Sequence, residues 1–425
     1  MQTEMLSRRS VVAATSGNTL EWYDFTVYGF LAPIIGQVFF PSDDPFAATL
    51  SAFAVLAIGY AARAIGSLVF GHIGDRLGRK PALILSVLLM GGGSFAIACL
   101  PTYDQIGISA AVLLVIIRIL QGISVAGEYT ASGVLIIEQT AMKRRAFIGS
   151  FVPFAMLMGC VLGSAVPAAL STMLSSDQMA TWGWRLPFLF GAAVAAFSAI
   201  LRRNLRESKA MPDGDRSGPS PVIVALTQHW RLITQMVILL MPTAVIYFMI
   251  FVYAASYLTG QMHVSSAKAL DITTLNLLAM ALMVPIFGWL ADRIGLRTVF
   301  LIAAIASVVL AAPLWGLMLE DSVLSIYLGQ LGLSLMNGVA WALSVTALTS
   351  MAPRDLRVST VALGYNICMA VFGGSTAMIA TYLVHRTGDN YAPVYYMVGA
   401  SLLSIPVIWR IPKLIADAQQ GHSEF

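Results

Sequence analysis

Charged residues are scarce in this sequence. Asp, Glu, Lys and Arg make up 11% of its 425 residues, whereas hydrophobic residues make up 58%. Soluble globular domains carry about 25% charged residues. A soluble fold of this length cannot hide so much apolar surface, so the composition excludes an ordinary soluble domain.

Motifs for enzymatic chemistry are also missing. The sequence has no Walker-type phosphate loop, no HExxH, no CxxC and no nucleophile elbow. Its three cysteines lack paired or metal-ligand spacing, and its five histidines are scattered. We therefore expect no enzyme, no cofactor and no metal site. The energy source is then an ion gradient or the gradient of the substrate itself.

Long apolar runs dominate the chain instead. A bilayer-spanning helix needs about 20 apolar residues, and twelve such runs lie between short breaks that contain charges, Gly or Pro. The predicted spans are 11–35, 47–70, 82–100, 106–138, 147–174, 185–201, 232–258, 268–290, 299–318, 323–350, 357–385 and 391–411.

Basic residues test this topology independently. Most of the 25 Lys and Arg residues fall in every second loop, which predicts that both termini are cytoplasmic. No cleavage pattern follows the first run, so we expect this run to direct insertion itself. The net charge of +4 reflects this topology and gives no reason to invoke nucleic acid.

The longest polar break divides six spans from six. We predict an N-terminal six-helix bundle over 1–201, a cytoplasmic linker over 202–231 and a C-terminal six-helix bundle with a short cytoplasmic tail over 232–425. GHIGDRLGRK at 71–80 is repeated as GWLADRIGLR at 288–297, at a constant offset of 217 residues. Each copy follows the second span of its half, which indicates an internal repeat.

The first copy resembles the signature of the major facilitator superfamily, G-x-x-x-D-R-x-G-R-K between helices 2 and 3. Further stretches are similar to the metabolite:proton symporter family, namely SGNTLEWYDFTVYG at 16–29, RILQGISVAGEY at 118–129, WGWRLPF at 182–188 and FGGSTAMIATYLVHRTG at 372–388.

This resemblance implies an all-α membrane protein with twelve transmembrane helices in two pseudo-symmetric six-helix bundles. It also implies a bacterial inner-membrane importer of citrate and related acids, 2-oxoglutarate, shikimate, proline or betaine. Two positions depart from the family: AARAIG around Arg63 lacks the usual proline after the arginine, and Ala377 replaces a proline of many members.

Carboxylates inside the predicted spans indicate a transport pathway, because a charge within the bilayer is costly. Glu21 and Asp24 share one face of the first helix with Asn18 and Tyr28. Neighbouring carboxylates compete for a proton. We interpret Asp24, Glu21 and Glu128 as proton-coupling residues, the alternative being carboxylates permanently paired with arginines.

Two arginines also lie within spans. The fork of Arg118 can bind an anionic substrate, or pair with Asp24 when the site is empty. Arg63 is a second possible anchor, unless its side chain reaches the cytoplasmic edge. With two arginines and three acids, protonation of one acid makes the pathway less negative, which favours an anionic substrate over a cationic one. The predicted substrate-binding residues are Arg118, Arg63, Asn18, Tyr28, Gln121, Tyr247, Asn337 and Asn366.

Tyr247, Asn337 and Asn366 belong to the second half, whose predicted spans carry no obvious buried charge. Buried Asn and Tyr side chains also serve as inter-helix hydrogen-bonding groups, which is the alternative for these three.

The repeated signature predicts a gate. Asp75, Arg76 and Arg79 in the first copy, and Asp292 and Arg293 in the second, can form inter-helix ion pairs that hold one face of the protein shut. The alternative is that these residues are solvated charges that only direct topology.

From these residues we predict a monomeric secondary transporter that works by alternating access. The leading prediction is symport of protons with a small organic acid, a citrate-like di- or tricarboxylate. The alternatives are symport of a zwitterion such as proline or betaine, and export of a carboxylate metabolite. A transporter-like sensor would need a signalling domain for which the chain has no room.

Overall fold

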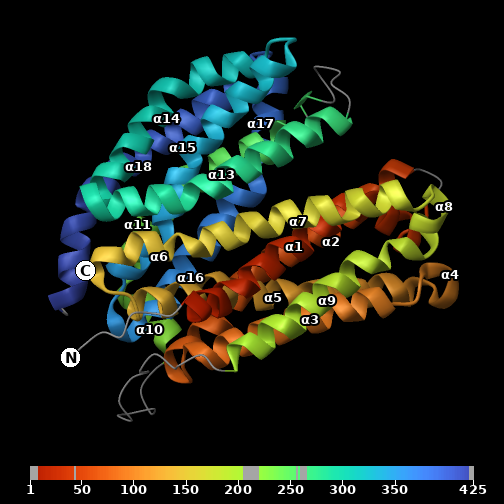
Figure 1. The fold of residues 1–425 in the computed structure, drawn as a ribbon, viewed down its shortest axis with the longest axis horizontal. Helices are drawn as coiled ribbons and strands as arrows, with labels where there is room; N and C mark the ends of the chain where they lie inside the picture. Colours follow the sequence, from red (N-terminus) through yellow and green to blue (C-terminus); the bar gives the residue numbers. More distant parts are fainter. Residues whose placement is uncertain (1–7, 43–44, 204–219, 255–256, 259–265, 421–425) are drawn as a thin grey trace. The chain divides into compact units, whose positions relative to one another are not determined.

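The computed structural model describes residues 8–42, 45–203, 220–254, 257–258 and 266–420, and the regular structure in these ranges is helical (Figure 1). Within these ranges, eleven helices are long and apolar enough to cross a membrane, when the short turns that continue them are included. α1 (Arg8–Phe39), which has polar and charged residues in its middle, completes the twelve. The predicted twelve-helix architecture is confirmed.

Contacts between residues divide the chain into two compact units. Of the described residues, the N-terminal unit comprises 8–42, 45–135 and 155–203, and the C-terminal unit comprises 136–154, 220–254, 257–258 and 266–420. The segment 136–154 thus packs with the C-terminal unit, whereas the sequence-based division at 201 places it in the N-terminal bundle. The domain boundaries drawn from sequence stay a prediction.

Helices of the N-terminal unit are joined by short connections. Their bounds after α1 are α2 (Pro45–Arg76), α3 (Arg79–Cys99), α4 (Tyr103–Ile106), α5 (Ile108–Glu138), α7 (Phe151–Met173), α8 (Ser176–Gln178) and α9 (Arg185–Arg202). α1 packs on α2, α3 and α9, and α3 packs on α9.

The C-terminal unit begins with the end of α5 and the helix that follows it. Its helices are α6 (Arg145–Gly149), α10 (Pro221–Gln228), α11 (Trp230–Phe248), α13 (Ser266–Ile294), α14 (Leu296–Met318), α15 (Val323–Met351), α16 (Arg357–Cys368), α17 (Gly374–Thr387) and α18 (Ala392–Gln420). α15 lies against α13 and α14, and α18 against α11 and α14.

The repeated signature forms the same turn in both halves. Gly78 precedes α3 with φ 108°, and Gly295 precedes α14 with φ 98°. Side chains disfavour positive φ, so glycine is the residue that fits both positions. The repeat detected in the sequence is therefore a repeat of backbone geometry.

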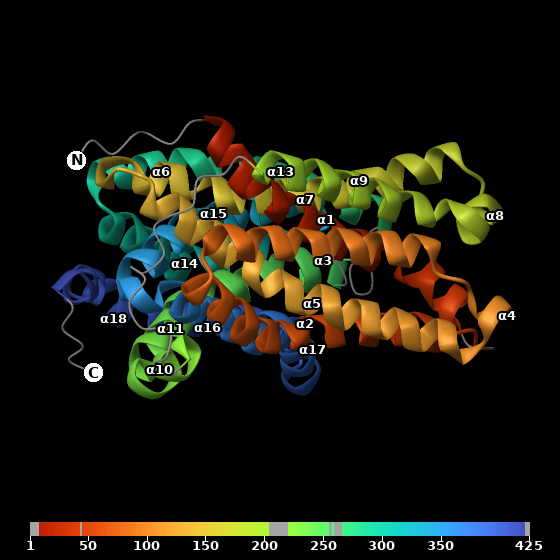
Figure 2. The same cartoon turned by 90° about the horizontal axis from the view of Figure 1, so that it is seen from below.

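Residues predicted as a polar linker are partly helical. The segment 204–219 lies outside the described residues, but α10 follows it and rests on α11 and α16 (Figure 2). Val222 and Ala225 of α10 are buried against Ile233 and Leu363. Four apolar side chains thus anchor the end of the predicted linker, which hydropathy alone had assigned to the cytoplasm.

Candidate functional site

Buried charges gather in the N-terminal unit. Among the described residues of the whole chain, the buried Asp, Glu, Lys and Arg side chains are Glu21, Asp24, Asp75, Glu128, Arg63, Arg79, Arg118 and Arg202. Four carboxylates therefore match four guanidinium groups. The described part of the C-terminal unit buries no Asp, Glu, Lys or Arg side chain, in agreement with its sequence.

Asp24 is fully buried and has partners on two other helices. Its Oδ2 accepts hydrogen bonds from Nη1 of Arg118 (2.9 Å) and Nε2 of Gln121 (3.1 Å), and its Oδ1 accepts one from Oγ of Ser94 (2.5 Å). Helices α1, α3 and α5 thus meet at one carboxylate. A proton on Asp24 would remove the charge that holds Arg118.

Arg118 has N–H groups that donate no hydrogen bond to the described residues. Its Nε and Nη2 have no hydrogen-bond partner among the described residues, although the side chain is fully buried. The guanidinium lies 3.9 Å from the ring centroid of Tyr28 and 5.9 Å from those of Phe25 and Phe188. Rings hold the cation without occupying its N–H groups, which leaves Arg118 able to bind a carboxylate.

Glu21 pairs with Arg63, whose Nη2 donates to Oε1 of Glu21 over 2.6 Å. Both residues are 1% exposed. The guanidinium of Arg63 is therefore paired inside the N-terminal unit and does not extend to solvent. The remaining predicted polar residue of α1, Asn18, donates from Nδ2 to Oγ of Ser132 (2.8 Å).

Glu128 has a partner that sequence reasoning missed. Arg202 donates from Nη1 (2.8 Å) and Nη2 to the two carboxylate oxygens of Glu128, and Ser86 donates to Oε2 (3.1 Å). Arg202 also donates to the carbonyls of Ala13, Leu83 and Ala14. Because Arg202 stands at the end of an apolar run, its position predicts a charge that only directs topology. The sequence did hold one indication of a buried partner, because two intramembrane arginines cannot neutralise three acids.

Polar residues predicted in the second half are buried in the C-terminal unit. The ring of Tyr247 contacts Phe251 and Trp341, with centroids 5.1 and 5.9 Å apart. Asn366 donates to the carbonyl of Ala362 one turn earlier (2.9 Å). These contacts lie between and within helices, which is the alternative that the sequence left open.

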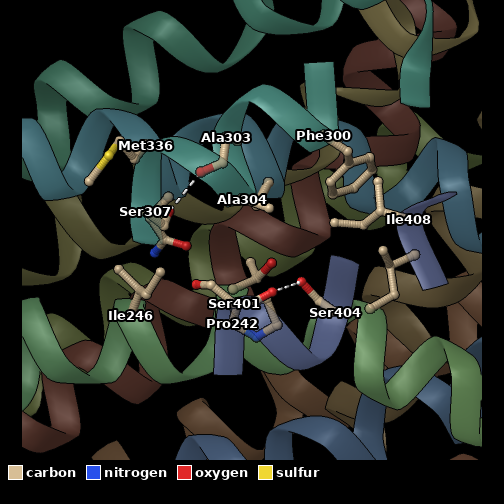
Figure 3. A pocket seen from close by; sticks show the side chains of 14 residues that line it. Pro242, Ile246, Phe300, Ala303, Ala304, Ser307, Met336, Ser401, Ser404 and Ile408 are labelled. Carbon is tan, nitrogen blue, oxygen red and sulfur yellow. Dashed lines mark hydrogen bonds between the residues drawn. The ribbon is translucent and has the colours of Figure 1, made fainter. Parts of the chain in front are cut away.

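Asn337 lines a small cavity of about 20 Å³, which is room for a water molecule. Turned so that its nitrogen faces the carbonyl of Thr243, its amide also accepts from the N–H of Tyr247. Figure 3 shows Ser307, Ser401 and Ser404 on the wall of this cavity, and the Ser307 and Ser404 hydroxyls donate to carbonyls of their own helices. The cavity is too small for a citrate-sized ligand.

The predicted gating residues each make separate contacts. Arg79 lies 3.8 Å from Asp75 and donates to the carbonyl of Gly74 (3.0 Å). Arg76 is half-buried at the end of α2. The guanidinium of Arg293 stacks on its neighbour Trp289, 4.1 Å from the ring centroid.

Asp292 caps a helix. Its two oxygens each accept a backbone N–H, from Ala146 and Phe147, over 2.9 Å. These N–H groups begin α6, so the carboxylate satisfies donors that the helix cannot. In the same unit, Nη1 of Arg357 donates to Oε1 of Glu138 (3.2 Å).

Known proteins resemble this chain in sequence and fold. The family model "Sugar (and other) transporter" matches residues 10–211, and "Major Facilitator Superfamily" matches 238–421. The glycine betaine/proline/ectoine/pipecolic acid transporter OusA of Dickeya dadantii (strain 3937) is 32% identical over 94% of this chain and 82% of its own length. The proline/betaine transporter of Escherichia coli (strain K12) is 33% identical over the same shares.

Among solved structures, the proton:xylose symporter XylE matches with a TM-score of 0.74 over 96% of this chain and 95% of its own chain, at 16% identity. Twelve helices, buried ion pairs and these relatives define a multi-pass membrane transporter and not an enzyme. The chain belongs to the major facilitator superfamily, and its resemblance to the metabolite:proton symporters is confirmed.

Proposed function

We propose that this protein imports a small zwitterion of the proline or betaine kind together with protons. The charge balance of the N-terminal unit carries this proposal: among its described residues, four buried carboxylates face four buried guanidinium groups. The sequence-based count of two arginines against three acids overlooked Arg202. A proton on Asp24 leaves one guanidinium, that of Arg118, without its carboxylate, which matches the single carboxylate of a zwitterion and not the several carboxylates of a tricarboxylate.

Relatives support the same choice. OusA and the Escherichia coli protein are named as transporters of betaine and proline. The citrate-like prediction is therefore replaced as the leading proposal by the zwitterion alternative. Bacterial relatives and the loop charges support an inner-membrane location with both termini cytoplasmic, and we propose a monomer.

Asp24 and Arg118 supply the coupling in this proposal. A proton arriving on Oδ2 of Asp24 removes the charge that holds Nη1 of Arg118 at 2.9 Å. The freed guanidinium then binds the carboxylate of the substrate. Because protonation and substrate binding both release the same ion pair, each favours the other, as thermodynamic linkage requires. Glu128, held by Arg202 and Ser86, is a structural residue in this scheme.

Uptake into liposomes by the purified protein tests the proposal. Labelled glycine betaine, proline and citrate are offered with and without an inward proton gradient, with Asp24→Asn and Arg118→Ala alongside. A zwitterion that enters with a proton carries one positive charge, so an inside-negative membrane potential should accelerate uptake further.

We expect gradient-driven accumulation of betaine or proline that both variants lose. Accumulation of citrate alone would restore the organic-acid prediction. Equal uptake with and without the gradient would rule out proton coupling.

A further inference from the structure

The ion pair between Glu21 and Arg63 is only half satisfied. One bond joins Nη2 to Oε1, but Oε2 of Glu21 and Nε of Arg63 have no hydrogen-bond partner among the described residues. Both side chains are almost completely buried. The pair of Glu128 and Arg202 differs, because both oxygens of Glu128 accept a hydrogen bond. Buried polar atoms without partners are unfavourable and call for an explanation.

The unsatisfied atoms have complementary charges. Oε2 of Glu21 needs a donor or a cation, and Nε of Arg63 needs an acceptor. A molecule with an ammonium group at one end and a carboxylate at the other satisfies both. A dicarboxylate satisfies Arg63 but repels Glu21.

Three aromatic rings surround the same pair. The guanidinium carbon of Arg63 lies 5.4 Å from the ring centroid of Tyr60, 5.7 Å from that of Trp22 and 5.8 Å from that of Phe25. Aromatic faces attract cations and bind quaternary ammonium groups in particular. These rings therefore already hold one cation, the guanidinium of Arg63.

The Glu21–Arg63 pair lies near the Asp24–Arg118 pair, and closely packed helices hold both arginines. Phe25 lies within 6 Å of the guanidinium carbons of both Arg63 and Arg118. A Cβ on Gly122 of α5 would overlap the carbonyl of Gly59 in α2, so the two helices that carry these arginines touch at their backbones. Rigid helices place binding groups more accurately than loops do.

The geometry points to a zwitterion-binding site in which the substrate inserts into the Glu21–Arg63 ion pair. The substrate carboxylate binds between Arg63 and the Arg118 guanidinium that protonation of Asp24 frees. Its ammonium group binds to Glu21 and to the rings of Trp22, Phe25 and Tyr60. In the absence of substrate, the Glu21 carboxylate and the Arg63 guanidinium therefore pair with each other in place of the two charged groups of the substrate. This inference rests on the proposed zwitterion transport and names the residues that select the cation.

A pair of isosteric ligands tests the inference. Glycine betaine and 3,3-dimethylbutanoate have the same shape, but the second replaces the quaternary nitrogen with carbon. Equilibrium binding of both to the full-length protein in detergent is measured for the wild type, Glu21→Gln, Trp22→Leu and Tyr60→Leu. Tyr60→Phe keeps the ring, and Phe39→Leu truncates a buried aromatic of α1 that packs on Trp184. Thermal unfolding of each variant verifies folding.

We expect the wild type to bind betaine at least tenfold more tightly than 3,3-dimethylbutanoate. Trp22→Leu and Tyr60→Leu should raise the Kd for betaine on the order of tenfold. Tyr60→Phe, which keeps the ring, should recover most of the affinity that Tyr60→Leu loses, while Phe39→Leu should stay within twofold of the wild type. Glu21→Gln should narrow the difference between the ligands. An unchanged ratio in folded Glu21→Gln, or an equal loss in Phe39→Leu and Trp22→Leu, would overturn the site. If the wild type accumulates no zwitterion in liposomes, the proposed function itself fails.

Discussion

Arg202, the last residue of α9, holds Glu128 of α5 at both carboxylate oxygens, although 74 residues separate the two in sequence. The same guanidinium donates to carbonyls of α1 and α3. Four helices of the N-terminal unit are therefore joined at one side chain. This ion pair completes the charge balance among the described residues of the unit, and Glu21 and Asp24 are the carboxylates to which we assign functional roles in our proposals.

Removing Arg202 should destabilise the protein. Arg202→Met leaves Glu128 buried without its counter-charge, which costs about 3–5 kcal/mol. The double variant Arg202→Met/Glu128→Gln should recover part of that loss. Thermal unfolding in detergent measures both. Arg203→Ala, at the exposed next position, is the control and should match the wild type. Equal stability of all four proteins would contradict the role of the pair.

Asp24→Asn should separate coupling from translocation. The amide cannot carry the proton, but it keeps the size of the side chain beside Arg118, Gln121 and Ser94. We expect energised uptake to fall at least tenfold, while exchange of labelled for unlabelled substrate stays within a few-fold of the wild type. Parallel loss of both activities would place Asp24 in substrate binding instead.

Asp292→Ala should loosen the start of α6. The substitution removes the acceptor of two backbone N–H groups, and losing a helix cap costs about 0.5–2 kcal/mol. Hydrogen exchange at Ala146 and Phe147 should accelerate. Arg293→Ala, which removes an exposed side chain stacked on Trp289, serves as the control. Unchanged exchange in Asp292→Ala would show that the cap is dispensable.

Two glycine substitutions should have opposite effects. Gly122→Ala places a Cβ on the carbonyl of Gly59 and forces α2 and α5 apart, so we expect lower thermal stability. Gly92→Ala meets nothing within 4 Å. Alanine favours a helix over glycine by about 0.5–1 kcal/mol, so Gly92→Ala should be neutral or stabilising. Similar melting temperatures for the two variants would argue against close contact of the helices.

His229 should make stability depend on pH. It lies between α10 and α11, is 7% exposed, and burial lowers the pKa of its imidazole. The unfolded chain binds a proton near pH 6.5, before the folded protein does. Stability should therefore fall as pH drops below about 6.5. His229→Gln should weaken this dependence between pH 7.5 and 5. The same slope in both proteins would exclude His229 as the cause.

Hydropathy predicted the twelve helices because the bilayer imposes length and composition on each span separately. The repeated signature predicted an internal repeat, and its glycines Gly78 and Gly295 form the same turn in both halves, since a positive φ is a local requirement. Neither feature depends on contacts between distant residues. The intramembrane positions of Asp24, Glu21, Arg63 and Arg118 followed from the same local information.

Partners of those charges could not be predicted in this way. The sequence allowed two positions for the Arg63 side chain, and it placed Arg202 in the predicted cytoplasmic linker. Hydropathy cannot distinguish an arginine at a helix end that faces water from one that faces the interior of the protein. Only the packing of α1, α3, α5 and α9 decides that Arg202 meets Glu128 and that Arg118 meets Asp24. Sequence by itself determined that charges lie inside the membrane, while the tertiary structure decided which charges neutralise one another, since ion pairing depends on distances between helices.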